Sequence, residues 1–128
     1  MTQRFGENPA DYPATGGHTG WDWATPTGTV VLAAADGVVT LAGSDPAWPG
    51  RGWHVVINHG DGWQSYVMHL SDLYVMPLER VEAGQPIGAS GGAPGTPGAG
   101  YSTGPHLHFD VRYQGVPVDC GPLIDGAA

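Results

Sequence analysis

The chain contains no lysine, a single cysteine and no long apolar run. Four Arg face twelve Asp and Glu residues, which gives a formal net charge of −8. Because contacts to phosphate groups depend on Lys and Arg, this composition argues against nucleic acid and against an anionic membrane surface as partners. No stretch approaches the ~20 apolar residues that span a bilayer, so we expect no membrane segment.

The scarcity of cysteine excludes two further classes of structure. Cys120 is alone, so no intramolecular disulfide and no Cys-rich zinc site can form. We expect Cys120 to be a small buried apolar residue.

The N-terminal "MTQRFGENPADYP" lacks the apolar segment of a secretory signal. We therefore expect no signal peptide, and any action outside a cell needs another route of delivery.

A helical period is almost absent, and short alternating runs joined by Gly-rich turns predict one all-β domain. We expect hairpins turning at Asp36-Gly37, at the "HGDG" of residues 59–62 and at Gln114-Gly115. "VEAGQPIGAS" predicts a short strand broken by Pro86, and "SDLYVMPLERV" is the only helix-like piece. Two long loops rich in Gly and Pro, 44–52 and 90–104, are candidates for functional loops.

Two of the six histidines lie one residue apart in "GPHLHFDV". In a strand, His106 and His108 project from the same face, about 7 Å apart. The alternate residues, which should face the core, are Leu107, Phe109 and Val111. Two adjacent imidazoles repel each other when protonated, which favours the neutral form that binds metals or acts as a base.

An upstream "GGHTGWDWA" supplies a second pair of candidate ligands, His18 and Asp22. In an extended strand these two would lie about 13 Å apart, too far to share one ion. Both can bind one ion only if the chain bends between them, and Gly20 permits such a bend.

Together these residues offer two nitrogen ligands and one oxygen ligand, the set of a catalytic zinc site with an open fourth position. Two histidines then remain for acid–base work, His69 and one of the 106/108 pair. His54 and His59 are expected to be hydrogen-bonded structural residues without a role in the site.

Three motifs, "GHTGWD", "YVMHL" and "GPHLHFDV", resemble in this order those of the LytM/lysostaphin-type (M23 family) zinc endopeptidases, which cut peptidoglycan peptides. The resemblance runs from about Gly16 to Val111. It also takes in "ATPTGTVVLAAADGVVTLAG" and "VVINHGDGWQSYVMHLS".

This resemblance implies a division of labour among the candidate residues. Zn²⁺ would be held by His18, Asp22 and His108, while His69 and His106 would be the catalytic pair. Tyr12 would stabilise the oxyanion of the tetrahedral intermediate through its hydroxyl group.

The fold implied is a compact antiparallel β-sheet domain of the duplicated-hybrid-motif type, with an active-site groove walled by the two long loops. Trp48, Trp53 and Tyr101 would be available there to contact substrate. The chain is expected to be one monomeric peptidase domain over residues 1–128, with an N-terminal segment 1–15 and a catalytic core 16–119.

The partner implied is the peptide stem of bacterial peptidoglycan, cut at D-Ala–diaminopimelate or Gly-Gly bonds. We expect a phage lysin or tail-associated enzyme that acts at the bacterial cell wall, or a domain of a longer cell-wall protein.

Two other functions are compatible with parts of this pattern. One is a catalytically silent module on the same fold that binds peptidoglycan or activates another hydrolase. The other is a His phosphocarrier domain, which also pairs two histidines but does not need His18 and Asp22. Stoichiometric zinc would separate the peptidase from the phosphocarrier.

Overall fold

The computed structural model describes residues 20–118. Their strands are β1 (Trp21–Ala24), β2 (Val30–Leu32), β3 (Gly37–Gly43), β4 (His54–Gly60), β5 (Trp63–Met68), β6 (Leu70–Leu73), β7 (Arg80–Val81), β8 (Pro86–Ser90), β9 (His106–Tyr113) and β10 (Val116–Val118), with a 3-10 turn η2 (Pro49–Arg51) before β4. Every strand pairing is antiparallel, and residues 20–118 contain no α-helix. The predicted all-β antiparallel fold is confirmed.

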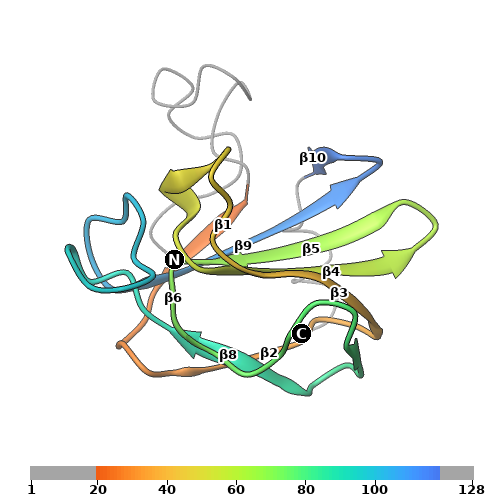
Figure 1. The fold of residues 1–128 in the computed structure, drawn as a ribbon, viewed down its shortest axis with the longest axis horizontal. Coiled ribbons are helices and arrows are strands. Elements are labelled where there is room, and N and C mark those ends of the chain that lie inside the picture. Colours follow the sequence, from red (N-terminus) through yellow and green to blue (C-terminus); the bar gives the residue numbers. More distant parts are fainter. Residues whose placement is uncertain (1–19, 119–128) are drawn as a thin grey trace.

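The strands form two sheets that face each other (Figure 1). The seven-stranded sheet has the order β1-β9-β5-β4-β3-β7, with β10 paired to β9. The three-stranded sheet has the order β2-β8-β6. Two of the predicted hairpins are confirmed, because β4 pairs with β5 across the "HGDG" turn and β9 pairs with β10 across Gln114-Gly115.

The predicted hairpin at Asp36-Gly37 is wrong. Both strands exist, but Val31 of β2 pairs with Gly88 in the small sheet, and Val39 of β3 pairs with Ile57 in the large one. The segment between them therefore crosses from one sheet to the other. A turn signal describes only local backbone, whereas the choice of pairing partner depends on residues far away in the sequence.

The region expected to be helix-like is also extended. Residues 70–73 form β6 and residues 80–81 form β7. Leu70 and Val81 are both buried in the core, so packing between the sheets overrides the weak local preference for a helical turn. Pro86 begins β8 instead of breaking a strand, a position where its missing N–H is tolerated.

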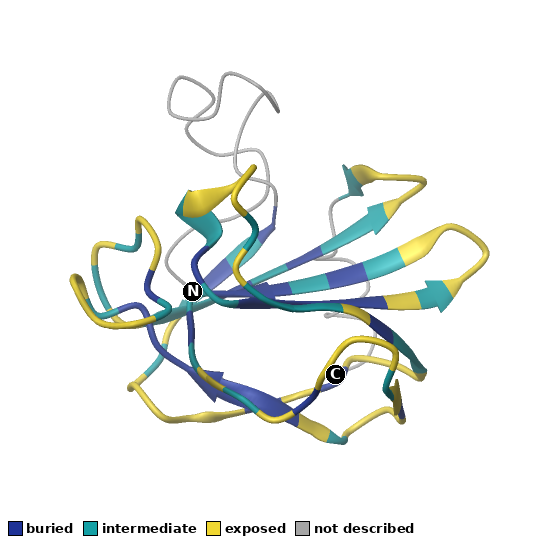
Figure 2. Cartoon of the chain, in the orientation of Figure 1, coloured by how far each residue is buried: buried dark blue, intermediate teal, exposed yellow. Residues whose placement is uncertain are grey.

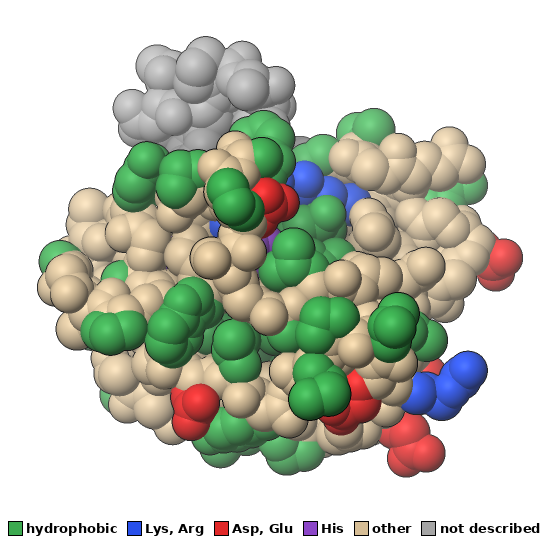
Figure 3. All heavy atoms as spheres, viewed as in Figure 1, with side chains coloured by type: hydrophobic (Ala, Val, Ile, Leu, Met, Phe, Trp, Pro, Cys, Tyr) green, Lys and Arg blue, Asp and Glu red, His purple; other side chains and the backbone are tan. Residues whose placement is uncertain are grey.

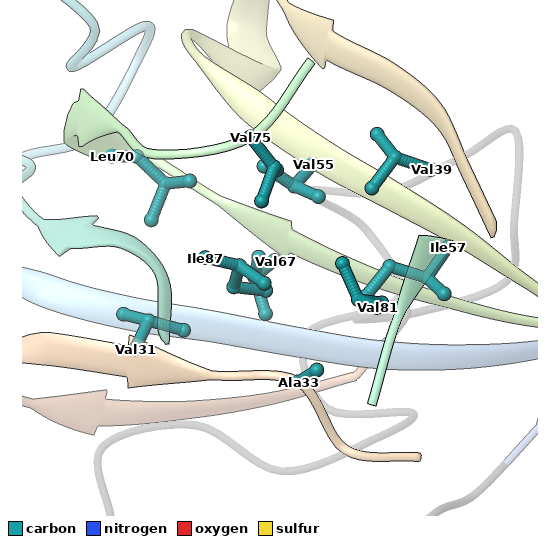
Figure 4. Packing of buried hydrophobic residues seen from close by; sticks show 10 residues of the cluster. All are labelled: Val31, Ala33, Val39, Val55, Ile57, Val67, Leu70, Val75, Val81 and Ile87. Atoms are coloured by element: carbon teal, nitrogen blue, oxygen red, sulfur yellow. The ribbon is translucent and has the colours of Figure 1, made fainter. Parts of the chain in front are cut away.

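The apolar core fills the space between the sheets, where most of the buried positions of the strands lie (Figure 2). Its side chains point toward one another from both sheets (Figure 4); they are Val31, Ala33, Val39, Val55, Ile57, Val67, Leu70, Val75, Val81 and Ile87. Leu107 and Phe109 pack against this cluster from β9, as their alternation with the histidines predicted. Within the described range there is no helix that is long and apolar enough to cross a membrane.

The opposite face of the large sheet carries the polar residues of β9. The register places Asp22 of β1 and Met68 of β5 on either side of His108, and Tyr66 of β5 beside Asp110. The core and the polar cluster thus occupy opposite faces of the same strands.

Candidate functional site

His108 lies between two carboxylates. Its Nδ1 is 2.9 Å from Oδ1 of Asp22, and its Nε2 is 2.9 Å from Oδ2 of Asp110. All three residues are buried. Burial alone would lower the pKa of His108, but the hydrogen bonds to Asp110 and Asp22 outweigh it and raise that pKa to about 9. A positive charge is therefore strongly favoured between these carboxylates.

Asp110 is oriented in turn by Arg112. Nε of Arg112 donates to Oδ1 of Asp110 at 3.0 Å, and the side chain of Asp110 is fully buried. Burial would raise the pKa of this carboxyl group, but hydrogen bonds from His108 and Arg112 hold it below its usual range. A permanent carboxylate at this position keeps the Nε2 of His108 protonated and leaves Nδ1 directed at Asp22.

This arrangement fits a metal centre. Metal-binding histidines commonly donate their other ring N–H to a carboxylate, as His108 does to Asp110. Nδ1 of His108 and Oδ1 of Asp22 are 2.9 Å apart, close enough for both to reach one cation. Residues 20–118 contain no group of three or more ligating side chains. The third expected ligand, His18, lies outside the described residues.

Two further imidazoles stand beside this pair. The rings of His69 and His106 are 4.8 Å apart between centroids, and the ring of His69 lies 6.3 Å from that of His108. Nε2 of His106 is 3.8 Å from Oδ1 of Asp22. The structure thus brings together four of the six residues predicted for the site: Asp22, His69, His106 and His108.

Backbone carbonyls orient both of these imidazoles. Nδ1 of His69 lies 2.8 Å from the carbonyl oxygen of Ala99, and Nδ1 of His106 lies 2.9 Å from that of Gly104. A carbonyl can only accept a hydrogen bond, so each Nδ1 carries a proton, and in the neutral form of either ring Nε2 presents the lone pair. Ser102 donates its hydroxyl to the same Gly104 carbonyl at 2.7 Å and approaches Nδ1 of His106 at 2.9 Å.

His69 is held at the junction of the two long loops. Its backbone is left-handed, with φ of 63°, and its N–H donates to the carbonyl oxygen of Arg51 in the first loop. Its ring is bonded to Ala99 in the second loop. Burial, followed by the neighbouring His106, lowers the pKa of His69 to about 4. This imidazole is neutral near pH 7 and can accept a proton.

The two loops contact each other through glycines. The N–H of Trp53 donates to Gly98, and that of Tyr101 donates to Gly50. A Cβ atom on Gly100 would lie 2.4 Å from the carbonyl oxygen of Gly50, too close for any other residue. Close backbone contact therefore fixes the carbonyl that orients His69.

The aromatic residues expected on these loops are only partly exposed. Trp48 and Tyr101 are exposed, whereas Trp53 is half-buried and packs against the core. Figure 3 shows a histidine side chain in a hollow of the surface, with acidic, hydrophobic and arginine side chains around it.

His54 and His59 are hydrogen-bonded within the fold, away from the cluster of Asp22, His69, His106 and His108. His59 bonds to the carbonyl oxygen of Asp36 and to the hydroxyl of Ser65. His54 is completely buried beneath the first loop, with its Nδ1 donating to the carbonyl of Gly52. Among residues 20–118, its Nε2 meets no hydrogen-bond partner.

Reasoning from the sequence missed the supporting residues. Asp110, Arg112 and Ser102 are not among the residues predicted for the site, although Asp110 follows His106 and His108 on the same face of the strand. The alternation of "HLHFDVR" also places Arg112 on that face, so this signal was present. His18, Tyr12 and Cys120 lie outside the described residues, and the roles predicted for them stay predictions.

The family model of Peptidase family M23 matches residues 16–120. The chain belongs to peptidase family M23. Over 102 residues, this M23 domain is 39% identical to the peptidoglycan DD-endopeptidase ShyA of Vibrio cholerae. That match covers 80% of this chain and 22% of the relative, so the chain spans about a fifth of the relative's length.

Solved structures show the same fold. The M23 domain superimposes on the antimicrobial peptidase lysostaphin from Staphylococcus simulans with a TM-score of 0.80 and 32% identity, over 98% of this chain and 49% of that chain. It matches a zinc-containing peptidase from Vibrio cholerae with a TM-score of 0.75 and 35% identity, over 92% of this chain and 34% of that one.

Proposed function

We propose that this M23 domain is a zinc endopeptidase that hydrolyses the peptide cross-links of bacterial peptidoglycan. The observation that carries the proposal is the placement of His108 between Asp22 and Asp110, with the rings of His69 and His106 beside it. A phosphocarrier or a silent binding module has no need for a buried carboxylate–imidazole pair together with two oriented bases.

The residues proposed to hold the zinc ion are His18, Asp22 and His108. Asp110, fixed by Arg112, would set the tautomer of His108 and raise the basicity of its Nδ1. A zinc ion held there would supply Lewis acidity, which polarises the scissile carbonyl group and lowers the pKa of water to about 7.

The proton transfers are assigned to His106 and His69. Both rings present Nε2 lone pairs, because backbone carbonyls accept the protons on Nδ1. One Nε2 would accept a proton from the attacking water and the pair would return a proton to the leaving amine. Tyr12 is proposed to donate its hydroxyl to the developing oxyanion, as the resemblance to the family suggests.

The bond is proposed to lie in a peptide stem or bridge, of the D-Ala–diaminopimelate or the Gly-Gly type. The relative ShyA is a peptidoglycan DD-endopeptidase, which supports the first type. Of the two solved structures described above, lysostaphin has the higher TM-score, but similarity of fold does not determine which peptide bond is cleaved.

The working unit is proposed to be a single monomeric domain over residues 1–128, with its catalytic core in residues 16–119, acting at the bacterial cell wall. The phage origin suggested by the resemblance stays a prediction. Genes for phage lysis or tail proteins next to the coding sequence would support it.

The test is a digest of two purified peptidoglycans, one with Gly bridges and one directly cross-linked. Each is treated with zinc-loaded protein and with chelator-stripped protein, and the new termini are identified by mass spectrometry. Zinc-dependent termini are expected from one wall and would name the bond. If zinc is bound and no termini appear from either wall, a catalytically silent module becomes the better description.

A further inference from the structure

Positive charge is rare in this chain, yet it gathers beside the site. The chain has four Arg and no Lys among 128 residues. Two of the arginines, Arg51 and Arg112, lie over the ring of Tyr66, with Cζ at 5.3 Å and 4.1 Å from its centroid. In Figure 3 arginine side chains lie near the histidine in the hollow, in an otherwise poorly cationic surface.

The charges of these two arginines are balanced differently. Arg112 forms an ion pair with Asp110, which is buried. Within the described part of the chain, Arg51 has no carboxylate at ion-pair distance. Asp45 is the nearest acidic residue on the same loop, and its Oδ1 accepts the N–H of Ala47. Burial and the repulsion from Arg112 lower the pKa of Arg51, and the charges of Tyr66, Asp110 and Asp45 only partly oppose this.

Although unpaired, the Arg51 side chain is held in place. Cζ of its guanidinium lies 4.6 Å from the centroid of the Trp48 ring and 5.3 Å from that of the Tyr66 ring. Cation–π contacts of this kind fix the plane of the guanidinium while leaving its N–H groups free to donate. Arg51 itself is only partly buried. It is therefore an oriented and accessible donor.

Arg51 also adjoins the proposed catalytic residues. Its carbonyl oxygen accepts the backbone N–H of His69 at 3.1 Å, so the loop that carries the guanidinium is bonded directly to the residue that carries this imidazole. Any substrate that reaches His69 and His106 passes next to this loop.

We propose that Arg51 binds a carboxylate of the substrate that lies next to the scissile bond. This inference rests on the proposed function. A guanidinium fork matches a carboxylate with two parallel hydrogen bonds. In a D-Ala–diaminopimelate cross-link, the carbon that bears the leaving amine also bears a carboxylate, whereas in a Gly-Gly bridge that carbon bears none. Arg51 thus selects diaminopimelate cross-links whose carboxylate is free.

The test uses two cross-linked muropeptide dimers that differ in one group. In one, the carboxyl group on the diaminopimelate carbon that bears the leaving amine is free, and in the other it is an amide. Wild-type zinc-loaded protein is expected to show a kcat/KM for the acid about ten- to a hundredfold above that for the amide, the range of a charge-assisted hydrogen bond. Arg51→Gln should bring this ratio close to one.

Two further variants make the result specific. Arg51→Lys keeps the charge without the fork and should give an intermediate ratio. Arg80→Gln, which removes an exposed arginine on β7, should leave the wild-type ratio unchanged. Circular dichroism confirms that each variant is folded. An equal rate on both dimers in the wild type, or an unchanged ratio in Arg51→Gln, would overturn the assignment.

A binding measurement separates this inference from the proposed function. Calorimetry on His106→Ala, with the acid and amide dimers, reports affinity without turnover, and Arg51→Gln in that background should abolish the preference for the acid. If the wild type cleaves neither dimer but the acid still binds more tightly through Arg51, the peptidase proposal fails alone. If both dimers are cleaved and bound equally, only the role of Arg51 fails.

Discussion

At the scale of single residues, chemical role is set by which partner each ring nitrogen meets. His108 faces carboxylates at both nitrogens, whereas His69 and His106 each face one backbone carbonyl. The first environment stabilises a cation, whereas the carbonyls of the second fix how the rings of His69 and His106 are oriented, and burial keeps His69 neutral. Three identical side chains therefore support two different roles.

Metal content should distinguish these roles. His108→Ala removes a proposed ligand and is expected to lose both zinc and turnover, as measured by elemental analysis and a peptidoglycan assay. His106→Ala should keep most of its zinc and lose turnover, because this residue only borders the pair of ligands. His59→Gln, on a histidine outside the site, serves as the control and should keep both. Equal loss of zinc in both alanine variants would refute the assignment within "HLH".

The buried His54 should make stability depend on pH. Burial lowers the pKa of His54 below 6.5 in the folded state, and the charges of Arg51 and Arg112 lower it further. The hydrogen bond to Gly52 and the charge of Asp45 only partly oppose this decrease. Below about pH 6.5 the unfolded chain therefore binds a proton that the folded chain does not. The free energy of unfolding should fall as pH drops through this point, by at most about 1.4 kcal/mol per pH unit from this group.

Denaturant unfolding of zinc-free wild type and His54→Gln at pH 7.5, 6.5 and 5.5 checks this expectation. The two profiles should converge toward low pH, since the variant lacks the group whose protonation destabilises the wild type. Profiles that stay parallel would show that His54 does not contribute.

At the scale of elements, two loops that look flexible in composition form one tight junction. Gly50 and Gly52 of the first loop lie against Gly98 and Gly100 of the second. The N–H groups of Trp53 and Tyr101 donate hydrogen bonds across this contact, to Gly98 and Gly50. The junction places the Ala99 carbonyl oxygen 2.8 Å from Nδ1 of His69. Glycine serves here because the two backbones approach closer than any side chain allows.

Two alanine substitutions in the second loop test this junction. Gly100 and Gly95 both have positive φ, 61° and 77°, so the backbone strain of an added Cβ is similar. Only Gly100 is crowded, with the oxygen of Gly50 2.4 Å from the added atom, whereas Gly95 has nothing within 4 Å. Gly100→Ala is therefore expected to lower kcat more than tenfold through His69, while Gly95→Ala costs about 1 kcal/mol of stability and leaves kcat near wild type. Similar kcat values in both would argue against the junction.

At the scale of the whole molecule, the core and the site use opposite faces of one sheet. The apolar cluster lies between the two sheets, and the carboxylates and imidazoles lie on the outer face of β9 and β1. We therefore expect the domain to fold without a metal, although a bound metal would stabilise the folded state by mass action.

Removal of zinc should abolish turnover while leaving the far-ultraviolet circular dichroism spectrum unchanged. The melting temperature should fall, because free zinc at a hundred times its dissociation constant adds about 2.7 kcal/mol of stability. Zinc added back should restore both properties. A chain that unfolds on chelation would contradict the separation of core and site.

The sequence by itself determined what depends on neighbours along the chain. Alternation placed His106, His108 and Asp110 on one face and Leu107 and Phe109 on the other. Glycine turns set two hairpins, and three motifs identified the family.

Only the tertiary structure decided which distant segments pair. It placed Asp22 beside His108 across β1 and β9, separated β2 and β3 into different sheets, and brought Arg51 and Arg112 to one ring. The physical reason is that side-chain alternation and turn conformation are local properties of the backbone. The pairing of strands and the meeting of loops depend on the burial of a shared core, to which residues from the whole chain contribute.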